Sequence, residues 1–276
     1  MKNFIFIITM LTLAACTSGS NQETTSNGGQ VTEETPVQIK VMEVTYSTDS
    51  TQMRGYIASP ANAENAPGIL IVHEWWGHNE YTRKRAEMLA ELGYVAFAID
   101  MYGDGKQAEH PSDAGKFAGQ VFENMPEAKA RFEAAMKQLK AQPGIDPDKI
   151  AAIGYCFGGS VVLTMANAGY DLDAVAAFHA GISLPIQPGE DLKAKVLVAN
   201  GADDPMVTAE AVTSFKNAMD AAGADYQYIA YEGAVHAFTN PGADALGEKF
   251  KIPLAYNKAA DEQSWEELKK LLNSVF

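Results

Sequence analysis

The sequence has few cysteines and a shortage of basic residues. Two cysteines in 276 residues are too few for a fold held together by disulfides. Lys and Arg number 21 against 35 Asp and Glu, and the net charge of −14 argues against binding to nucleic acid or to an anionic membrane surface. No internal repeat is visible, and 23 Gly and 12 Pro are too few for a fibrous chain. What remains is a chain with 47% hydrophobic residues and the length of one α/β domain with extensions.

The first sixteen residues differ from the rest of the chain. After a short basic start, residues 4–13 form the apolar run FIFIITMLTL, which is followed by Ala14-Ala15-Cys16. The run is too short to span a bilayer and is typical of an export signal. Its end resembles the lipobox of bacterial lipoproteins, which implies that residues 1–15 are a signal peptide and that Cys16 carries the lipid. The alternative is an ordinary signal peptide, or a buried strand, with an incidental cysteine.

Residues 16–37 are predicted to comprise the lipid-attachment cysteine and a flexible tether. Residues 17–36 are polar, contain Val31 as their single aliphatic residue and have no aromatic residue, so they cannot bury a core. We therefore expect an exported protein of the bacterial cell envelope, anchored by its lipid to the inner or outer membrane. The folded domain is predicted to occupy residues 38–276. Within it Cys156 has no partner for an internal disulfide.

Apolar runs and helical segments alternate along this domain. Residues 38–46 and 52–59 alternate in polarity and predict an antiparallel pair at one edge of a sheet. The remaining segments predict a mostly parallel sheet with helices on both faces, which is an α/β fold. Strands are predicted over 69–72, 94–99, 149–153, 174–178, 195–199 and 226–231, and helices over 80–92, 126–139, 158–166, 212–222 and 259–272. Ligands bind beyond the carboxyl ends of such strands, where reactive residues are therefore expected.

The strand predicted at residues 149–153 is followed by a candidate nucleophile. Gly154-Tyr155-Cys156-Phe157-Gly158 is the G-x-S-x-G pattern with Cys in place of Ser. The small flanking residues permit a sharp strand-to-helix turn that presents the side chain of Cys156, and a helix N-terminus favours a thiolate. The Phe157 amide is placed to donate to a developing oxyanion. The alternative is a buried structural cysteine.

Two later strands end in groups that can activate a thiol. Asp203 and Asp204 follow the strand predicted at 195–199, and His236 follows the last strand. The order Cys156, Asp204, His236 is the nucleophile, acid and histidine order of α/β-hydrolases. Asp203 competes with Asp204 for the acid role, and the residue without that role is a turn or capping residue. The alternative for His236 is a surface-loop imidazole.

Taken together, these segments resemble the dienelactone hydrolase family over about residues 41–276. The matching pieces are His73-Glu74-Trp75-Trp76-Gly77, Gly154-Tyr155-Cys156-Phe157-Gly158-Gly159, Gly201-Ala202-Asp203-Asp204 and residues 231–238. The resemblance implies an α/β-hydrolase fold, a Cys156–His236–Asp204 triad and Trp75 as the second backbone donor to the oxyanion. It also implies that Glu74 contacts the resting thiol and helps to ionise it. The alternative is an ion pair of Glu74 with Arg83 or Arg85.

One departure from the family concerns the substrate. Characterised members hold an anionic substrate with arginines, one of them four residues after the catalytic histidine, where this chain has Asn240. Neutral esters or lactones are therefore expected to be better substrates than carboxylate-bearing ones. The predicted pocket residues are the side chains near these loops, namely Trp76, Tyr102, His179, Phe238 and Asn240.

The sequence thus predicts a carboxymethylenebutenolidase-like hydrolase that cleaves carboxylic esters or lactones through a thiol acyl-enzyme. We expect no cofactor and no metal, a small-molecule ester or lactone as substrate, a membrane contact only through the lipid on Cys16, no nucleic acid and a monomeric state. The first alternative is a surface lipoprotein that binds a small molecule without catalysis. The second is a thioesterase or peptidase on the same fold.

Overall fold

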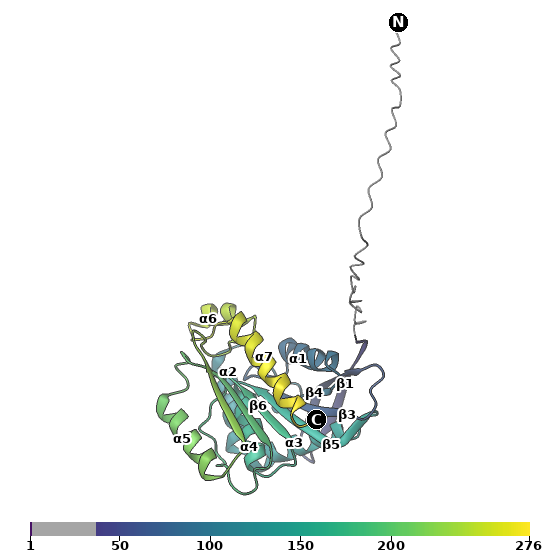
Figure 1. Ribbon diagram of the computed structural model, residues 1–276, viewed down its shortest axis with the longest axis horizontal. Helices are drawn as coiled ribbons and strands as arrows, with labels where there is room; N and C mark the ends of the chain where they lie inside the picture. Colours follow the sequence, from purple (N-terminus) through teal and green to yellow (C-terminus); the bar gives the residue numbers. More distant parts are fainter. Residues whose placement is uncertain (2–36) are drawn as a thin grey trace, which may run out of the picture. The chain divides into compact units, whose positions relative to one another are not determined.

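The computed structural model describes residue 1 and residues 37–276. The predictions for the signal peptide, Cys16 and the tether fall outside the described residues. Within the described part, eight strands form one sheet in the order β1-β2-β4-β3-β5-β6-β7-β8 (Figure 1). The strands are β1 (Ile39–Ser47), β2 (Gln52–Pro60), β3 (Ala66–Val72), β4 (Val95–Ile99), β5 (Ile145–Tyr155), β6 (Ala174–Phe178), β7 (Lys195–Gly201) and β8 (Tyr226–Tyr231).

The sheet confirms the predicted mixture of strand directions. β1 pairs with β2 and β2 with β4 in antiparallel fashion, and all further pairs from β4 to β8 are parallel. In register, Val72 of β3 lies beside Gly154 of β5, and Phe178 of β6 beside Ala199 of β7. The carboxyl ends of the parallel strands therefore lie along one edge of the sheet, and the loops that follow them are neighbours.

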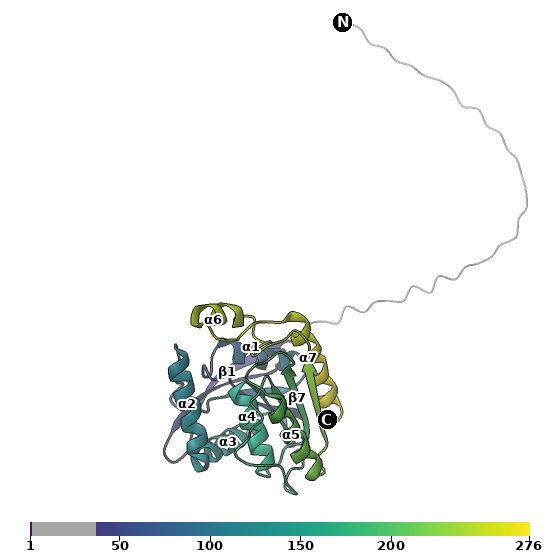
Figure 2. The ribbon, with the colours of Figure 1, turned by 90° about the vertical axis from the view of Figure 1, so that its left-hand side faces the viewer.

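Helices cover both faces of this sheet (Figures 1 and 2). They are α1 (Glu80–Glu91), α2 (Pro111–Glu123), α3 (Met125–Lys140), α4 (Phe157–Asn167), α5 (Ala209–Ala221), α6 (Ala243–Phe250) and α7 (Lys258–Asn273). Two of them, α2 and α6, were not predicted from the sequence. Each buries only two residues, Ala114 and Val121 in α2 and Ala243 and Gly247 in α6, so each contributes little to the core. Among residues 37–276, no helix has the length and apolar character needed to cross a bilayer.

The core has two layers because alternate residues of a strand point to opposite faces. Leu70 and Val72 of β3 pack with Phe132 of α3 and the helices of one face. Ile69 and Ile71 of the same strand pack with Leu89 of α1 and Leu268 of α7 on the other. All four β3 residues are completely buried, and each contributes about 1.5–3 kcal/mol through removal of apolar surface from water. A strand buried on both faces reads as an unbroken apolar run, which is why β3 was predictable.

Candidate active site

Cys156 lies at the turn between β5 and α4 in a strained backbone conformation. Its φ is 54° and its ψ is −117°, in the left-handed region that non-glycine residues rarely adopt. The turn is held by close packing, since a Cβ on Gly158 would lie 2.2 Å from the Val72 carbonyl oxygen. The side chain of Cys156 is half-buried. Phe157 is the first residue of α4, so its N–H has no acceptor within the helix and is available to a ligand.

Asp204 and His236 meet beyond the ends of β7 and β8. His236 Nδ1 lies 2.8 Å from Asp204 Oδ2, and both side chains are buried. The other carboxylate oxygen of Asp204 accepts the Met206 N–H at 2.8 Å. Asp203 is exposed, and its N–H donates to the Ala234 carbonyl at 3.0 Å. The structure therefore brings Asp204, rather than Asp203, to the histidine.

The other ring nitrogen of His236 faces the thiol. Among the described residues, the buried Nε2 has no hydrogen-bond partner of normal geometry. Cys156 is nevertheless close enough to change the pKa of the His236 ring. Burial lowers the pKa of His236, but the neighbouring Cys156 and Asp204 outweigh burial and raise that pKa above its ordinary value. This arrangement favours the protonated imidazolium form of His236.

Glu74 is completely enclosed and is hydrogen-bonded to Asn240. Asn240 Nδ2 donates to Glu74 Oε2 at 2.6 Å, while Asn240 Oδ1 accepts the Gly242 N–H at 2.8 Å, which fixes the orientation of the amide. Burial raises the pKa of Glu74 to about 7, although Asn240 and the charges of His236 and Arg85 partly oppose this. Glu74 is not in the ion pair considered as an alternative, because Arg83 binds Glu43 and Arg85 binds Asp261.

The turn that contains Trp75 is fixed from both sides. The Glu74 carbonyl accepts the Gly77 N–H at 3.1 Å and lies 2.6 Å from His73 Nδ1. His73 Nε2 accepts the Met101 N–H at 3.2 Å, so the proton of this ring belongs on Nδ1. The Tyr102 hydroxyl donates to the Trp75 carbonyl at 2.9 Å. These bonds hold the peptides around Trp75 in one orientation, as an oxyanion donor requires.

A buried polar cluster behind His236 was missed by the sequence analysis. Thr239 Oγ1 lies 2.6 Å from the Tyr81 hydroxyl and 2.7 Å from His179 Nε2. Arg85 donates to the Thr239 carbonyl at 2.6 Å and to Asp261 of α7 at 2.5 Å. The cluster links α1, α7 and the end of β6 to the loop that carries His236. Tyr81 and Thr239 are 158 residues apart, and no local pattern signals their contact.

The structure places the predicted pocket residues mostly inside the protein. Phe238 and His179 are completely buried and lie against each other, with 5.4 Å between ring centroids. Burial and the charges of His236 and Arg85 lower the pKa of His179 well below its ordinary value, so the ring is neutral. Trp76 stacks on Phe250 of α6, and Tyr102 supports Trp75. Within the predicted set, His179 packs against the His236 ring, with 5.4 Å between ring centroids, and Asn240 is bonded to Glu74.

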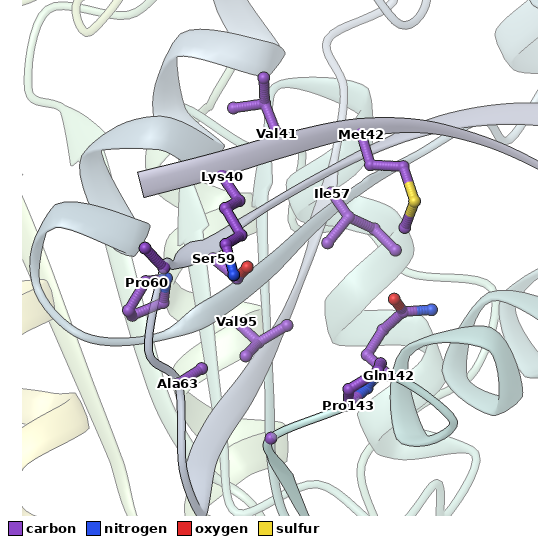
Figure 3. Close-up of a pocket in the computed structure, with 12 residues that line it drawn as sticks. Lys40, Val41, Met42, Ile57, Ser59, Pro60, Ala63, Val95, Gln142 and Pro143 are labelled. Carbon is purple, nitrogen blue, oxygen red and sulfur yellow. The ribbon is translucent and has the colours of Figure 1, made fainter. Parts of the chain in front are cut away.

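Two hollows lie at opposite ends of the sheet. One, of about 430 Å³, is lined by Ser160, Met206 and neighbouring residues close to the catalytic candidates. The other, of about 550 Å³, lies at the amino ends of the parallel strands, between the start of β1 and the loop before β5. Figure 3 shows Met42, Ile57 and Val95 around this second hollow. Its position excludes it as the place where Cys156 reacts.

Among residues 37–276, no group of three or more His, Cys, Asp and Glu side chains is placed to hold a metal ion. His73 and Glu74 instead have the hydrogen-bond partners described above, and His78 is buried, with a pKa that burial lowers to about 3.

The strand order of the sheet and the sharp turn from β5 to α4 at Cys156, which is called a nucleophile elbow, define an α/β-hydrolase. The model of the dienelactone hydrolase family matches residues 53–276, and the chain belongs to this family of hydrolases. It is 30% identical over 219 residues to the protein usf of Aquifex pyrophilus, covering 78% of this chain and 94% of that protein.

Two solved structures agree with this assignment. The structure of m3DLH superimposes with a TM-score of 0.81 at 35% identity, over 86% of this chain and 99% of the other. The dienelactone hydrolase-like promiscuous phosphotriesterase P91, from metagenomic libraries, superimposes with a TM-score of 0.80 at 31% identity and the same coverage.

Proposed function

We propose that this protein hydrolyses carboxylic esters or lactones through a thiol acyl-enzyme formed on Cys156. The observation that carries the proposal is the buried pair of Asp204 and His236, whose second ring nitrogen is left for the Cys156 thiol. A nucleophile, a base and a carboxylate that orients the base are the groups that acyl transfer needs. Membership of the dienelactone hydrolase family supports the same reaction class.

The reaction follows from these positions. The Cys156 thiolate attacks the carbonyl carbon, and the electron pair of the C=O bond moves to the oxygen, which accepts the N–H groups of Phe157 and Trp75. The intermediate collapses, the C–O bond to the alcohol breaks, and His236 gives its Nε2 proton to the leaving alkoxide. Water then attacks the thioester while His236 takes its proton, and the acid leaves as the C–S bond breaks. Asp204 holds the ring through both proton transfers.

We further propose that Glu74 acts as a second acid–base group toward the thiol. With a pKa of about 7, its carboxyl group exchanges a proton readily near neutral pH. Asn240 holds one carboxylate oxygen in the resting site. We propose that an ester oxygen of the substrate competes for the Asn240 amide and releases the Glu74 carboxylate toward the thiol. Glu74 then takes the thiol proton while His236 is already protonated, and it returns this proton to Cys156 after the C–S bond breaks.

A neutral substrate suits this site better than an anionic one. Asn240 offers a hydrogen-bond donor without charge, and the Arg85 guanidinium is already bound to Asp261 and to a backbone carbonyl. A carboxylate entering such a site loses hydration without gaining a paired cation. The net charge of −14 also slows the approach of anions.

The test is a panel of esters and lactones given to residues 37–276, with Cys156→Ala as the blank. Matched neutral and carboxylate-bearing members are compared by kcat/KM, and we expect the neutral member to be the better substrate. Asn240→Arg is expected to narrow that gap. Hydrolysis of thioesters or peptides in place of oxygen esters would favour the thioesterase or peptidase alternative. A protein that binds panel members but turns none over would be the non-catalytic lipoprotein.

We also propose that the hydrolase is attached to the bacterial cell envelope through a lipid on Cys16. The support is the sequence alone, because an apolar run and two alanines precede this cysteine. Cys16→Ser is expected to move the full-length protein from the membrane fraction to the soluble fraction. A variant that stays fully in the membrane fraction would rule out the lipid anchor.

A further inference from the structure

A hollow of about 430 Å³ lies between α2, the first turn of α4, the loop after β6 and the start of α5. Its walls are mainly apolar, and they contain no ionisable side chain. Its apolar lining includes the side chains of Phe122, Ile182, Leu184, Met206, Val207 and Ala211. Its volume falls in the range of sites that bind small organic ligands.

Three contacts connect this hollow to the reacting groups. Ser160 in its wall is one helical turn from Cys156, and its N–H lies 3.3 Å from the Cys156 carbonyl oxygen. Met206 in its wall donates its N–H to the Asp204 carboxylate at 2.8 Å. Phe122 packs edge-on against Phe157, with 5.5 Å between ring centroids. The hollow thus borders the elements that carry the nucleophile, the acid and an oxyanion donor.

Ser160 and Ser183 are the polar side chains among the residues that line the hollow. Ser160 Oγ donates to the Gly181 carbonyl at 2.7 Å, so its hydroxyl proton is not offered to a ligand. Ser183 is exposed and lies at the outer rim. A charged or strongly polar group placed inside would lose its hydration without compensation, whereas an alkyl or aryl group would gain contacts.

We propose that this hollow holds one apolar arm of the substrate, and that the preferred substrates are uncharged esters with an alkyl or aryl arm longer than acetyl or methyl. The inference rests on the proposed function, because it assigns a substrate class to the same nucleophile. It adds a specificity-determining set of residues that the sequence analysis did not identify. Met206 is unbranched and 46% exposed, which allows it to adjust to arms of different shape.

The experiment measures kcat/KM for two series of esters, and hydrolysis is detected by the acid that it releases. One series keeps methanol as the alcohol and lengthens the acid from acetate to octanoate, and the other keeps acetate and lengthens the alcohol. Ala211→Leu places a larger side chain in the hollow. Ala209→Leu is the matched control, because Ala209 is exposed on the same helix and does not line the hollow.

We expect wild-type kcat/KM to rise with length in one of the two series. Ala211→Leu should lower it about tenfold or more for the long members of that series and less than about twofold for methyl acetate. Ala209→Leu should match the wild type throughout. Thermal unfolding of both variants shows whether each is folded. A flat profile, or an equal loss for short and long members in a folded Ala211→Leu variant, would overturn the inference.

Ser183→Lys provides a second variant that should keep the fold, because Ser183 is exposed. It adds a cation at the rim of the hollow. For methyl esters of matched length, the ratio of kcat/KM for the carboxylate-ended to the neutral member should rise at least about fivefold, and added salt should reverse the gain. No change in this ratio would count against occupancy of the hollow. If the wild type hydrolyses no ester in either series, the proposed function itself fails.

Discussion

The two ends of the parallel sheet are built in opposite ways. At the carboxyl end, Cys156 and His179 adopt positive φ values, and Glu74 and Asp204 are buried carboxyl groups. At the amino end, the hollow of Figure 3 is lined mainly by aliphatic side chains such as Met42 and Val95. Asn65 at the amino end also has a positive φ, but among the described residues only the carboxyl end combines such backbone with buried carboxyl groups. Strain and buried charge both destabilise a fold, as expected at a site built for chemistry. The predictions below test this contrast.

Removal of the nucleophile should have the largest effect. Cys156→Ala is expected to lower kcat by about 10⁵-fold, since loss of a catalytic nucleophile removes the covalent route. The fold should persist, because alanine is small enough for the elbow. Ester hydrolysis and circular dichroism measure the two properties. Retention of more than about a tenth of wild-type activity would refute the assignment, and Cys156→Ser should also be impaired.

The two neighbouring aspartates provide an internal comparison. Asp204→Asn should lower kcat by roughly 10³-fold or more, because an amide no longer orients and charges the His236 ring as a carboxylate does. Asp203→Asn, at an exposed position, should change kcat less than about threefold. Steady-state kinetics of the two variants decides between them. The reverse order would transfer the acid role to Asp203.

The buried carboxyl group of Glu74 should make stability depend on pH. Its pKa rises from 4.5 in the unfolded chain to about 7 in the fold, so both states are protonated below pH 4.5 and both are ionised above pH 7. Between these values only the unfolded state loses its proton. The free energy of unfolding should therefore fall as pH rises, by up to about 3 kcal/mol.

Glu74→Gln should abolish that decrease. The free energy of unfolding of the variant, relative to that of the wild type, should therefore be larger at pH 8 than at pH 4. Urea unfolding at a series of pH values measures the difference. Glu64→Gln, at an exposed position, is the control and should keep the wild-type pH dependence. An unchanged slope in Glu74→Gln would mean that Glu74 ionises normally.

A change at the amino end should have the smallest effect. Met42 is 48% exposed beside the distant hollow. Met42→Ala is expected to change the free energy of unfolding by no more than about 0.5 kcal/mol and kcat/KM by less than about twofold. Urea unfolding and ester kinetics provide the measurements. A large loss of activity would show that the two ends of the sheet are coupled.

Much of the fold follows from the sequence because the signals are local. The apolar run at Ile69–Val72 predicts a strand buried on both faces. Gly158, two residues after Cys156, packs on the Val72 carbonyl, so the glycines around Cys156 predict a turn that lies against this strand. The order of Cys156, Asp204 and His236 along alternating strands and helices places them on one edge of the sheet. The structure then brings Asp204 to His236 at hydrogen-bond distance.

The remainder depends on long-range packing of loops. Asn240 meets Glu74 across 166 residues, and nothing in the sequence near either residue predicts which partner it takes. The aromatic side chains expected to line a pocket are instead core residues, because residue type alone does not fix the direction of a loop side chain. The apolar hollow beside Ser160 is formed by four separate segments, so no single segment reveals it.

The bond between Arg85 and Asp261 ties the loop that carries His236 to the last helix, α7. A chain clipped before Lys258 still contains Cys156, Asp204 and His236, yet it lacks Asp261 and the whole of α7. Arg85, buried against Thr239, would then be an unneutralised cation beneath the histidine loop. Proteolytic loss of the last helix should therefore inactivate the enzyme although Cys156, Asp204 and His236 all remain. A tag or fusion partner attached next to α7 should lower activity in the same way if it displaces the helix.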